Sequence, residues 1–472
     1  MKQGRPTGWH PGRRASDPAR LLVFDVLMDV AERGAYANLA LPEALRHSGL
    51  RRLDRAFATN LCYGTLRLQG RWDAIISRVA HGRSASEIDL PLLTLLRMGC
   101  HQLLAMDSPA YAVLDETVTI ARNELGQGSG GFVNAILRRV AEKADQWRTV
   151  IEESTASQEE FLSLWYSHPR WLVHEFQRTC AYYGRGNVEE ILDADNEPAD
   201  VALVARGIST SELAERIVKA HFTSRPGTMM ADALLLDSGD PHQIYPVRDG
   251  LAGVQDEGSQ LISHVCASAP ISSHTGLWLD LCAGPGGKTA TMAPLAQRAG
   301  ARIHANEPHE HRVHLVERAV DPWADVVDLR QGDGRDVGTQ EPDSYDRVLV
   351  DAPCSNSGAI RRRPEARWNH VGSDLEQLTR LQAELLESGY RALAPGGVLV
   401  YSTCSPLLSE TVDIVEGLVN THPEAQVLDT AQVASQCALH PISGRNGYVQ
   451  LFTDTDNTDS MFFACLTKRI EA

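Results

Sequence analysis

The segment Leu277-Trp278-Leu279-Asp280-Leu281-Cys282-Ala283-Gly284-Pro285-Gly286-Gly287-Lys288 decides the fold of the C-terminal half of this 472-residue chain. Residues 277–281 are mostly apolar and typical of a buried strand, and a helical pattern begins directly after the glycines. A strand, a glycine turn and a helix in this order form the first turn of a doubly wound sheet, which holds a cofactor near the switch point of the sheet. The segment therefore predicts a cofactor site at the carboxyl edge of a parallel sheet.

Further strand-like runs follow the same alternation toward the C-terminus. They lie at residues 302–306, 326–329, 347–350, 398–401 and 461–466, with helix-like stretches between most of them. Strands that alternate with helices favour a parallel, doubly wound sheet. We therefore predict an α/β domain of the Rossmann-like class over residues 251–472, with a mostly parallel sheet.

The chain is too long for one core, so more than one domain is expected. Residues 1–17 are interpreted as a flexible basic tail. Residues 18–145 carry apolar residues at spacings of three and four and predict an all-α helical bundle. Residues 146–250 are mixed, with a strand expected at 201–205 and a helix at 211–220, and are interpreted as a small α+β linker subdomain.

The composition, 43% hydrophobic and 22% charged residues, is that of a globular protein. No apolar run reaches 18 residues and the N-terminus lacks a secretory signal, so we expect no membrane span. Nine cysteines without a C-x-x-C pair argue against a disulfide framework and against a metal site. These features predict a reducing, cytoplasmic location, and we expect a monomer.

The net charge of −16 counts against a nucleic-acid-binding protein. Arginines nevertheless gather within residues 46–83 and again at Arg361, Arg362, Arg363 and Arg367, beside Trp368. A local basic patch can bind phosphate on an acidic protein, because salt screens remote charges beyond about 10 Å at 0.1 M. The alternative interpretation is that these are solvated helix faces.

The cofactor is suggested by the glycine turn together with two acids. Gly284-Pro285-Gly286-Gly287 matches neither G-x-G-x-x-G nor the phosphate-binding loop. The next predicted strand ends at Glu307, and the third is followed by Asp333; an acid at a strand end can bond ribose hydroxyls. S-adenosylmethionine fits better than a dinucleotide, since no second mononucleotide half is evident. Each acid taken alone could equally be a solvated loop residue or a helix cap.

Two thiols and a carboxylate follow the fourth and fifth predicted strands, in Asp351-Ala352-Pro353-Cys354 and Ser402-Thr403-Cys404-Ser405. Carbon-5 of cytosine becomes nucleophilic only when a thiolate adds to carbon-6, and a carboxyl group at ring nitrogen 3 stabilises the adduct. Lys288 or the nearby arginines are expected to lower the pKa of the attacking thiol. The spacing leaves open which thiol attacks. Single cysteines elsewhere are interpreted as small buried apolar residues.

These motifs, in their order along the chain, resemble those of the Sun/Fmu-type RNA cytosine carbon-5 methyltransferases. The resemblance rests on Val254-Gln255-Asp256-Glu257-Gly258-Ser259-Gln260, residues 282–288, residues 351–354, Arg361 to Glu365 with Trp368, and residues 402–405 with Glu410. The helical region, through residues 63–67, 96–103 and 131–138, resembles the NusB-like RNA-binding domain of the bacterial member that modifies small-subunit ribosomal RNA. Residues 167–171 and 196–198 resemble the connecting region of that member.

The resemblance implies a role for each residue of the motifs. Cys404 would be the nucleophile and Cys354 would assist product release, with Asp351 and Lys288 beside them. The S-adenosylmethionine contacts would be Cys282, Ala283, Gly284, Pro285, Gly286, Gly287, Lys288, Glu307, Asp333 and Asp351. Arg361, Arg362, Arg363 and Arg367 would hold RNA phosphate. Trp368 would stack on a base or pack beneath a loop.

The sequence departs from the family pattern at two places. Asn356 and Ser357 stand where the family usually has glycine and threonine, and the last strand begins at Asp459-Ser460-Met461 without the usual Asp-Gly pair. Asparagine adopts the left-handed backbone that glycine permits, so we expect activity to survive. The second departure bears on the shape of the C-terminal hairpin.

The sequence thus predicts S-adenosylmethionine-dependent methylation of carbon-5 of a cytidine in RNA, with small-subunit ribosomal RNA as the substrate. The same reaction on transfer RNA is an alternative. A non-catalytic RNA-binding assembly factor is another, although that class predicts loss of a thiol or of the glycine loop. A Rossmann-type dehydrogenase fits poorly, because it leaves both strand-end thiols without a use.

Overall fold

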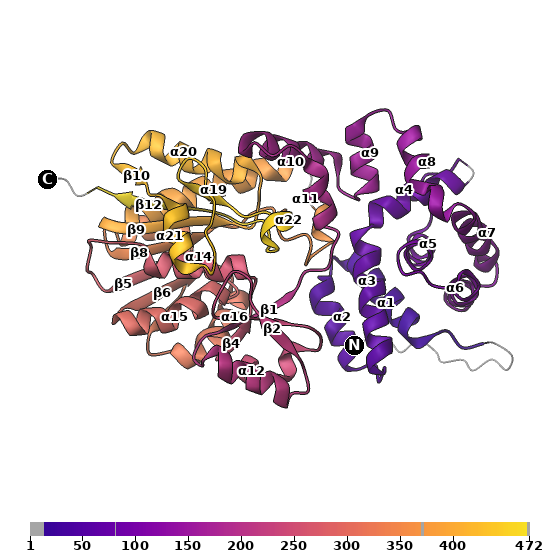
Figure 1. Ribbon diagram of the computed structural model, residues 1–472, viewed down its shortest axis with the longest axis horizontal. Coiled ribbons are helices and arrows are strands. Elements are labelled where there is room, and N and C mark those ends of the chain that lie inside the picture. Colours follow the sequence, from indigo (N-terminus) through magenta and orange to yellow (C-terminus); the bar gives the residue numbers. More distant parts are fainter. Residues whose placement is uncertain (1–13, 81, 370–371, 470–472) are drawn as a thin grey trace. The chain divides into compact units, whose positions relative to one another are not determined.

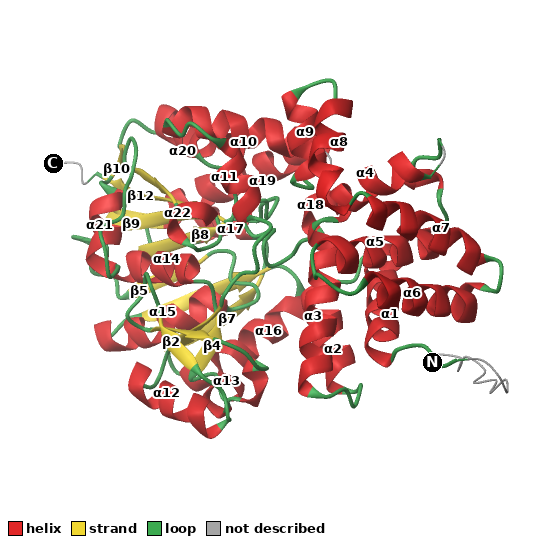
Figure 2. Cartoon of the chain, turned by 45° about the vertical axis from the view of Figure 1, so that its right-hand side comes forward, coloured by secondary structure: helices red, strands yellow, loops and turns green. Residues whose placement is uncertain are grey.

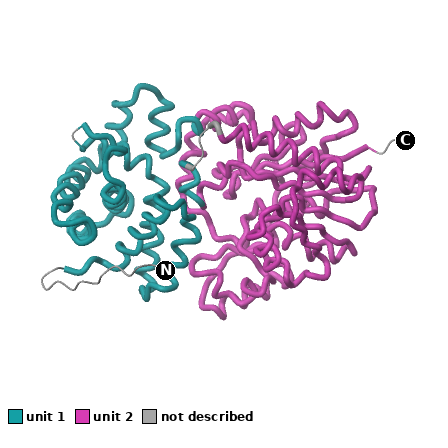
Figure 3. The backbone as a smooth tube through the Cα atoms, turned by 180° about the vertical axis from the view of Figure 1, so that it is seen from behind, with its two compact units in different colours: residues 1–173, 363–368 teal, residues 174–362, 369–472 magenta. Residues whose placement is uncertain are grey.

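The computed structural model describes residues 14–80, 82–369 and 372–469; most of the expected N-terminal tail lies outside them. The chain divides into two compact units, shown in two colours in Figure 3. The first comprises residues 1–173 and 363–368, and the second comprises residues 174–362 and 369–472. Every strand of the described structure belongs to the second unit (Figure 2).

The first unit is helical, as predicted (Figure 1). Its helices are α1 (Pro18–Arg33), α2 (Ala37–Arg46), α3 (Arg52–Arg67), α4 (Gln69–Val79), α5 (Leu90–Leu104), α6 (Ala110–Leu125), α7 (Ser129–Glu142), α8 (Trp147–Ser154) and α9 (Gln158–Trp165). The Asp17 side chain accepts from the Arg20 amide at the start of α1, and Gly34 ends that helix with φ 64°. Helix α7 begins within the glycine-rich stretch Gly126 to Gly131. A Cβ at Gly130 would lie 2.6 Å from Nε of Arg122 in α6, so glycine allows these helices to approach closely.

A short segment distant in sequence, residues 363–368, is part of the helical unit. It contains the start of α18 (Ala366–Asn369). Arg367 is only 1% exposed, and its Nη1 donates to the carbonyl oxygens of Arg67 at 2.9 Å and Ser167 at 3.2 Å. Buried Glu365 accepts from the amide of Ala37. The segment therefore satisfies backbone groups of the bundle.

The second unit begins with most of α10 (Arg170–Tyr183), then α11 (Val188–Ala194) and a small antiparallel sheet. The strand order is β2 (Ser224–Pro226), β3 (Ala233–Leu236), β1 (Val201–Ala205), β4 (Ala252–Val254). Helix α12 (Thr210–Lys219) packs on this sheet, with Leu213 and Ile217 in one apolar cluster with Leu203 and Leu234. A short helix, α13 (Tyr245–Arg248), precedes β4.

The large sheet of the second unit is mostly parallel, as predicted. Its order is β10 (Ala425–Val427), β12 (Phe462–Lys468), β9 (Leu393–Thr403), β8 (Tyr345–Asp351), β5 (Leu277–Asp280), β6 (Arg302–Glu307), β7 (Val327–Gln331), with β11 (Tyr448–Gln450) beside β12. Strands β5 to β9 are parallel. Strands β10, β11 and β12 are antiparallel to their neighbours.

Helices cover both faces of this sheet (Figure 1). One face packs against α14 (Glu257–Ser268), α15 (Gly287–Ala299), α16 (Glu310–Val320) and α21 (Thr430–Cys437); the other packs against α17 (Gly334–Gln340), α19 (Gly372–Ala392) and α20 (Val412–Thr421). Successive residues of β8 alternate accordingly: Leu349 packs on the first face, and Val348 and Val350 pack on the second. The core is therefore two apolar layers that the sheet separates.

The order of the strands places a switch point between β5 and β8. The chain runs from β5 outward through β6 to β7 and then returns to add β8 on the other side of β5. Ligands of open α/β sheets bind outside the carboxyl ends of the strands at such a point. Among the helices of residues 14–80, 82–369 and 372–469, none is long and apolar enough to cross a membrane.

Candidate active site

The glycine loop joins β5 to α15 at the switch point. It consists of Cys282, Ala283, Gly284, Pro285 and Gly286, after which Gly287 begins the helix. Gly286 has φ 97°, a conformation that favours glycine. A Cβ at Gly284 would lie 2.2 Å from Oε2 of Glu307, so only glycine allows this approach. A Cβ at Gly287 would meet no atom within 4 Å, which leaves open space over the start of α15.

The acids predicted from the strand ends surround this loop. Glu307 ends β6, is buried, and accepts from the amides of Gly284 and His309. Asp333 caps α17 through the Arg335 amide, and its hydrogen bond with the Arg335 side chain lowers its pKa. Burial raises the pKa of the Cys282 thiol well above its ordinary value, and Asp280, Asp351, Glu307 and Asp333 raise it further.

This donor set suits a cofactor that carries ribose hydroxyls and a positive charge. Asp351, Glu307 and Asp333, which raise the pKa of Cys282, create a negative field that favours a sulfonium cation. The close approach of the loop at Gly284 and the space over Gly287 provide a cradle for the ligand. The residues present therefore fit S-adenosylmethionine.

Lys288 and Asp351 form an ion pair beside the loop. Nζ of Lys288 lies 2.8 Å from Oδ2 of Asp351, and Oγ of Ser402 donates to the other carboxylate oxygen at 2.8 Å. Asp351 stands opposite Ser402 in the register of β8 and β9, which explains this contact. Burial lowers the pKa of Lys288, but Asp351 and, more weakly, Cys404 raise it by more. Lys288 therefore stays an ammonium next to the thiols.

The two predicted thiols meet. Sγ of Cys354 lies 3.3 Å from Sγ of Cys404, and the latter lies 3.1 Å from Oδ1 of Asn356. Asn356 has φ 56°, the left-handed conformation expected of it. The hydrogen bond with Cys404, followed by burial, raises the pKa of Cys354 well above its ordinary value. The sequence-predicted set of Cys404, Cys354, Asp351 and Lys288 thus comes together in one place.

One buried carboxylate beneath the thiols was not predicted as functional. Glu410 accepts from Ser355, Ser405 and Gln382, and is fully buried. In the sequence, Glu410 stands out only as a residue of the motif at 402–410. The sequence signal that could have indicated a shared partner is that a serine directly follows both Cys354 and Cys404.

The predicted arginine cluster does not lie together at an open surface. Arg361 is buried and bonds to Asn457, while Arg362 forms ion pairs with Asp256 and Asp459. Arg367 is buried in the helical unit as described above. Arg363 is exposed, and Trp368 is 37% exposed. These two are the members of the set with accessible side chains.

Trp368 also packs against a neighbour in the helical unit. A Cβ at Gly70 would lie 2.8 Å from Cη2 of Trp368. The sequence left two roles open for Trp368, base stacking and packing beneath a loop. This contact is a packing contact.

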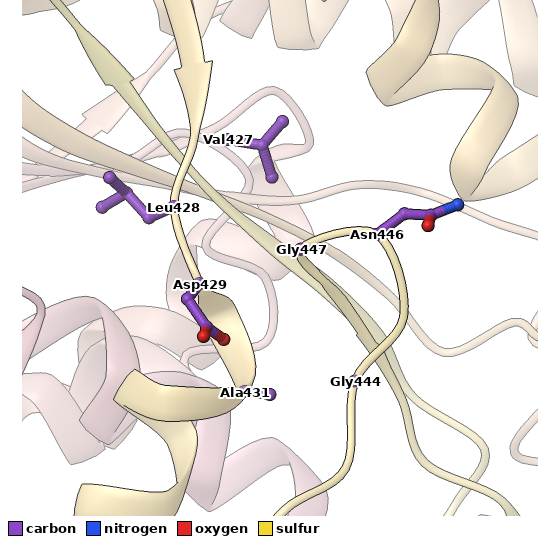
Figure 4. Close-up of a pocket in the computed structure, with 7 residues that line it drawn as sticks. All are labelled: Val427, Leu428, Asp429, Ala431, Gly444, Asn446 and Gly447. Atoms are coloured by element: carbon purple, nitrogen blue, oxygen red, sulfur yellow. The ribbon is translucent and has the colours of Figure 1, made fainter.

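A separate depression lies where β10 leads into α21 (Figure 4). Its lining is Val427, Leu428, Asp429, Ala431, Gly444, Asn446 and Gly447. Asp429 caps α21 by accepting from the amide of Gln432. The depression includes no residue of the glycine loop and neither thiol, so it is distinct from the site described here.

Comparison with known proteins matches both units. The model of the NusB family covers residues 17–142, and that of the 16S rRNA methyltransferase RsmB/F family covers residues 268–467. The putative methyltransferase Rv1407 of Mycobacterium tuberculosis is 42% identical over 98% of this chain and 99% of its own. The ribosomal RNA small subunit methyltransferase B of Yersinia pseudotuberculosis is 30% identical over 90% of this chain and 96% of its own.

Solved structures share the fold. The crystal structure of PH0851 superposes with a TM-score of 0.79 at 21% identity, over 97% of this chain and all of that one. NSun6 from Pyrococcus horikoshii gives a TM-score of 0.51 at 16% identity, over 63% of this chain and 98% of that one. At these identities the likeness establishes the fold.

The switch-point loop, the acids at the strand ends and the doubly wound sheet define a class I methyltransferase fold. With the family matches, the chain belongs to the 16S rRNA methyltransferase RsmB/F family. It is an S-adenosylmethionine-dependent RNA methyltransferase with a NusB domain at its N-terminus. Among the described residues, no group of histidine, cysteine and acidic side chains is arranged to hold a metal ion.

Proposed function

We propose that this enzyme methylates carbon-5 of a cytidine in small-subunit ribosomal RNA through a covalent cysteine–cytosine intermediate. The observation that carries the proposal is the paired thiols, 3.3 Å apart, beside an ion pair at the cofactor edge of the sheet. A methyltransferase that acts on a nucleophilic oxygen or nitrogen needs no thiol. Two thiols and a carboxylate match the needs of an unreactive ring carbon.

Cys404 would be the nucleophile. Cys404 is among the groups that raise the pKa of Lys288, so the nucleophile has an ammonium group in its surroundings. The thiolate adds to carbon-6 of the base, which makes carbon-5 enamine-like. As the thiolate adds, nitrogen 3 of the ring would take up a proton from solvent, and Asp351 would accept a hydrogen bond from this N–H and stabilise the adduct. Lys288 and Ser402 orient the Asp351 carboxylate. The bound cofactor supplies an electrophilic methyl group to carbon-5.

Cys354 would assist product release. After methyl transfer, a solvent base would take the carbon-5 proton, and the electron pair of that bond would reform the carbon-5–carbon-6 double bond. The carbon-6–sulfur bond breaks at the same time and returns its electron pair to sulfur. A raised pKa keeps Cys354 protonated, so it can donate a hydrogen bond to the departing sulfur of Cys404. Without Cys354, the adduct would persist.

The base must leave its stack to reach this site, at a cost of a few kcal/mol. The helical unit and exposed Arg363 would contact RNA backbone, with Trp368 as a candidate for base stacking. The Yersinia relative, matched over 96% of its own length, is named a ribosomal RNA small subunit methyltransferase, and this name supports ribosomal over transfer RNA.

Single-cysteine variants test the chemistry. Cys404→Ala should bind RNA but transfer no methyl group, because no adduct forms. Cys354→Ala should accumulate a covalent RNA–protein adduct, seen as a band of reduced mobility in a denaturing gel. Cys437→Ala, which changes a partly buried cysteine of α21, is the control and should behave as the parent enzyme. An adduct from Cys404→Ala, or none from Cys354→Ala, would contradict the assigned roles.

Bisulfite sequencing tests the substrate. In RNA from a strain that lacks the gene, one cytidine of small-subunit ribosomal RNA should lose protection, and the gene should restore it. The Cys404→Ala gene should not. Loss of protection in transfer RNA alone would instead favour the alternative substrate.

A further inference from the structure

Glu410 is the centre of a buried hydrogen-bond network. Its Oε1 accepts from the Ser355 amide at 2.8 Å and from Nε2 of Gln382 at 3.0 Å. Its Oε2 accepts from the hydroxyls of Ser355 at 2.5 Å and Ser405 at 2.6 Å. The side chain is inaccessible to solvent, so it touches neither substrate nor cofactor. A buried carboxylate that meets only donors is strongly held and strongly orients its partners.

The partners of this carboxylate directly follow the two thiols. Ser355 is the residue after Cys354, and Ser405 is the residue after Cys404. We propose that Glu410 is a positioning residue, which acts through the two serines to hold both thiols of the site at one fixed separation. The proposal rests on the proposed function for what the thiols do, but the geometry that it predicts can be measured without catalysis.

The two cysteine segments are also bonded to each other. Oγ of Ser357 lies 3.0 Å from Oγ of Ser355 and 3.0 Å from Oγ of Ser405, which closes a ring of hydroxyls around the carboxylate. The amide of Gly358 donates to the carbonyl of Cys404 at 3.0 Å. A Cβ at Gly358 would lie 2.1 Å from the carbonyl oxygen of Ser460, so this segment is closely packed from its other side. Loss of the carboxylate would therefore remove the common acceptor of Ser355 and Ser405, while the bond between the Gly358 amide and the Cys404 carbonyl would remain.

The charge of Glu410 also distinguishes the thiols. The hydrogen bond with Cys404, burial and the Cys404 charge raise the pKa of Cys354, and the Glu410 carboxylate adds to the increase. Cys404 instead is one of the groups that raise the pKa of the Lys288 ammonium. One thiol thus faces an anion and the other a cation.

Two variants of Glu410 distinguish the effect of its hydrogen bonds from the effect of its negative charge. Glu410→Gln keeps the shape and can retain all four contacts, since the serine hydroxyls can rotate to accept from the amide. Glu410→Ala removes the bonds. Because a displacement of about 1 Å costs about 100-fold in rate, we expect kcat to fall about 100-fold in Glu410→Ala and about tenfold in Glu410→Gln. KM for RNA and for S-adenosylmethionine should stay within about twofold, since no binding contact is lost.

The spacing of the thiols is measured directly by crosslinking with diamide. The reagent takes up two electrons and two protons to become a hydrazine, and the thiols of Cys354 and Cys404 become a disulfide, seen as a loss of two hydrogens in the linked peptides. The disulfide should form readily in the parent protein and about tenfold more slowly in Glu410→Ala. Glu410→Gln should react at close to the parent rate.

Asp346→Asn is the matched control. Asp346 is likewise buried and accepts from the Ser273 hydroxyl and the amides of Thr275 and Gly276, at the opposite end of β8 from the thiols. Its variant should lower the unfolding temperature but change neither kcat nor the crosslinking rate. The proposal is overturned if Glu410→Ala crosslinks at the parent rate, or if its kcat falls no more than that of Asp346→Asn. If the parent enzyme methylates no cytidine, the proposed function fails while the crosslinking rates still decide the role of Glu410.

Discussion

The residues of the site show how far a local sequence pattern can be interpreted. The sequence predicted that Cys354, Cys404, Asp351 and Lys288 lie together, because parallel strands end at one edge of a sheet. It could not predict the burial of Arg361, whose partner Asn457 lies about a hundred residues further along the chain. Nor could it identify the hydrogen-bond network around Glu410, which forms only when three separate segments of the chain meet. Such partnerships are set by tertiary packing, which leaves no periodic signal.

Asp280 at the end of β5 makes stability depend on pH. It is buried, and burial raises its pKa from 3.8 to about 7, although the hydroxyl of Thr289 bonds to one oxygen. The folded state therefore binds a proton that the unfolded chain has released between these pH values. The stabilising contribution is full below about pH 4 and is lost as pH rises toward 7, by about 1.4 kcal/mol per pH unit.

Replacing Asp280 by Asn, which stays neutral, should remove this dependence. We expect the unfolding temperature of the parent minus that of Asp280→Asn to fall steadily from pH 4 to pH 7. Asp333→Asn serves as the control, because its pKa is lowered rather than raised and its difference should not fall over this range. A constant difference for Asp280→Asn would show that the carboxyl titrates normally.

At the scale of elements, the strands of the large sheet were predicted within a few residues, because their apolar runs are buried on both faces. Strand β9 is longer than the expected 398–401, since it extends back to Leu393 through a register shift against β8. The short strands β10 and β11 were not predicted. Each has three residues and depends on pairing with β12, so neither carries a pattern of its own.

Two helix glycines offer a test of how the elements pack. Gly338 of α17 is buried, and a Cβ there would lie 2.2 Å from the carbonyl oxygen of Ser388 in α19. Gly338→Ala should separate the two helices and cost about 1–3 kcal/mol. Gly417 of α20 is exposed with nothing within 4 Å of its Cβ, so Gly417→Ala should stabilise by about 0.4–1 kcal/mol.

Hydrogen exchange of the amides in α17, α19 and α20 measures both effects locally. Gly338→Ala should accelerate exchange in α17 and α19, and Gly417→Ala should slow it in α20. Unchanged or slower exchange in α17 and α19 of Gly338→Ala would refute the assigned packing of α17 on α19.

At the scale of the whole molecule, the sequence predicted a helical part followed by an α/β part. The expected limits at residues 145 and 250, and the monomeric state, stay predictions. No local pattern predicted that residues 363–368 belong to the helical unit. Their arginines were interpreted as a phosphate-binding group. Arg367 instead bonds to two backbone carbonyls of the bundle.

The stability of the helical unit should accordingly depend on this distant segment. Arg367→Met leaves the carbonyls of Arg67 and Ser167 without a charged donor, and should cost about 3 kcal/mol. Arg363→Met, which changes an exposed residue of the same segment, should change stability by less than about 0.5 kcal/mol. Amide exchange in α3 and α9 is the measurement. Unchanged exchange in Arg367→Met would show that the segment is dispensable to the bundle.

Residues 363–368 follow part of the second unit in the sequence but belong to the helical unit. The polypeptide therefore passes from one unit to the other three times, not once. A gene fusion that carried the first 173 codons to another enzyme would produce a bundle that lacks the Arg367 donor to the carbonyls of Arg67 and Ser167. The two units are therefore expected to be inherited together. A protein that joined this bundle to another enzyme would need a different segment in place of residues 363–368.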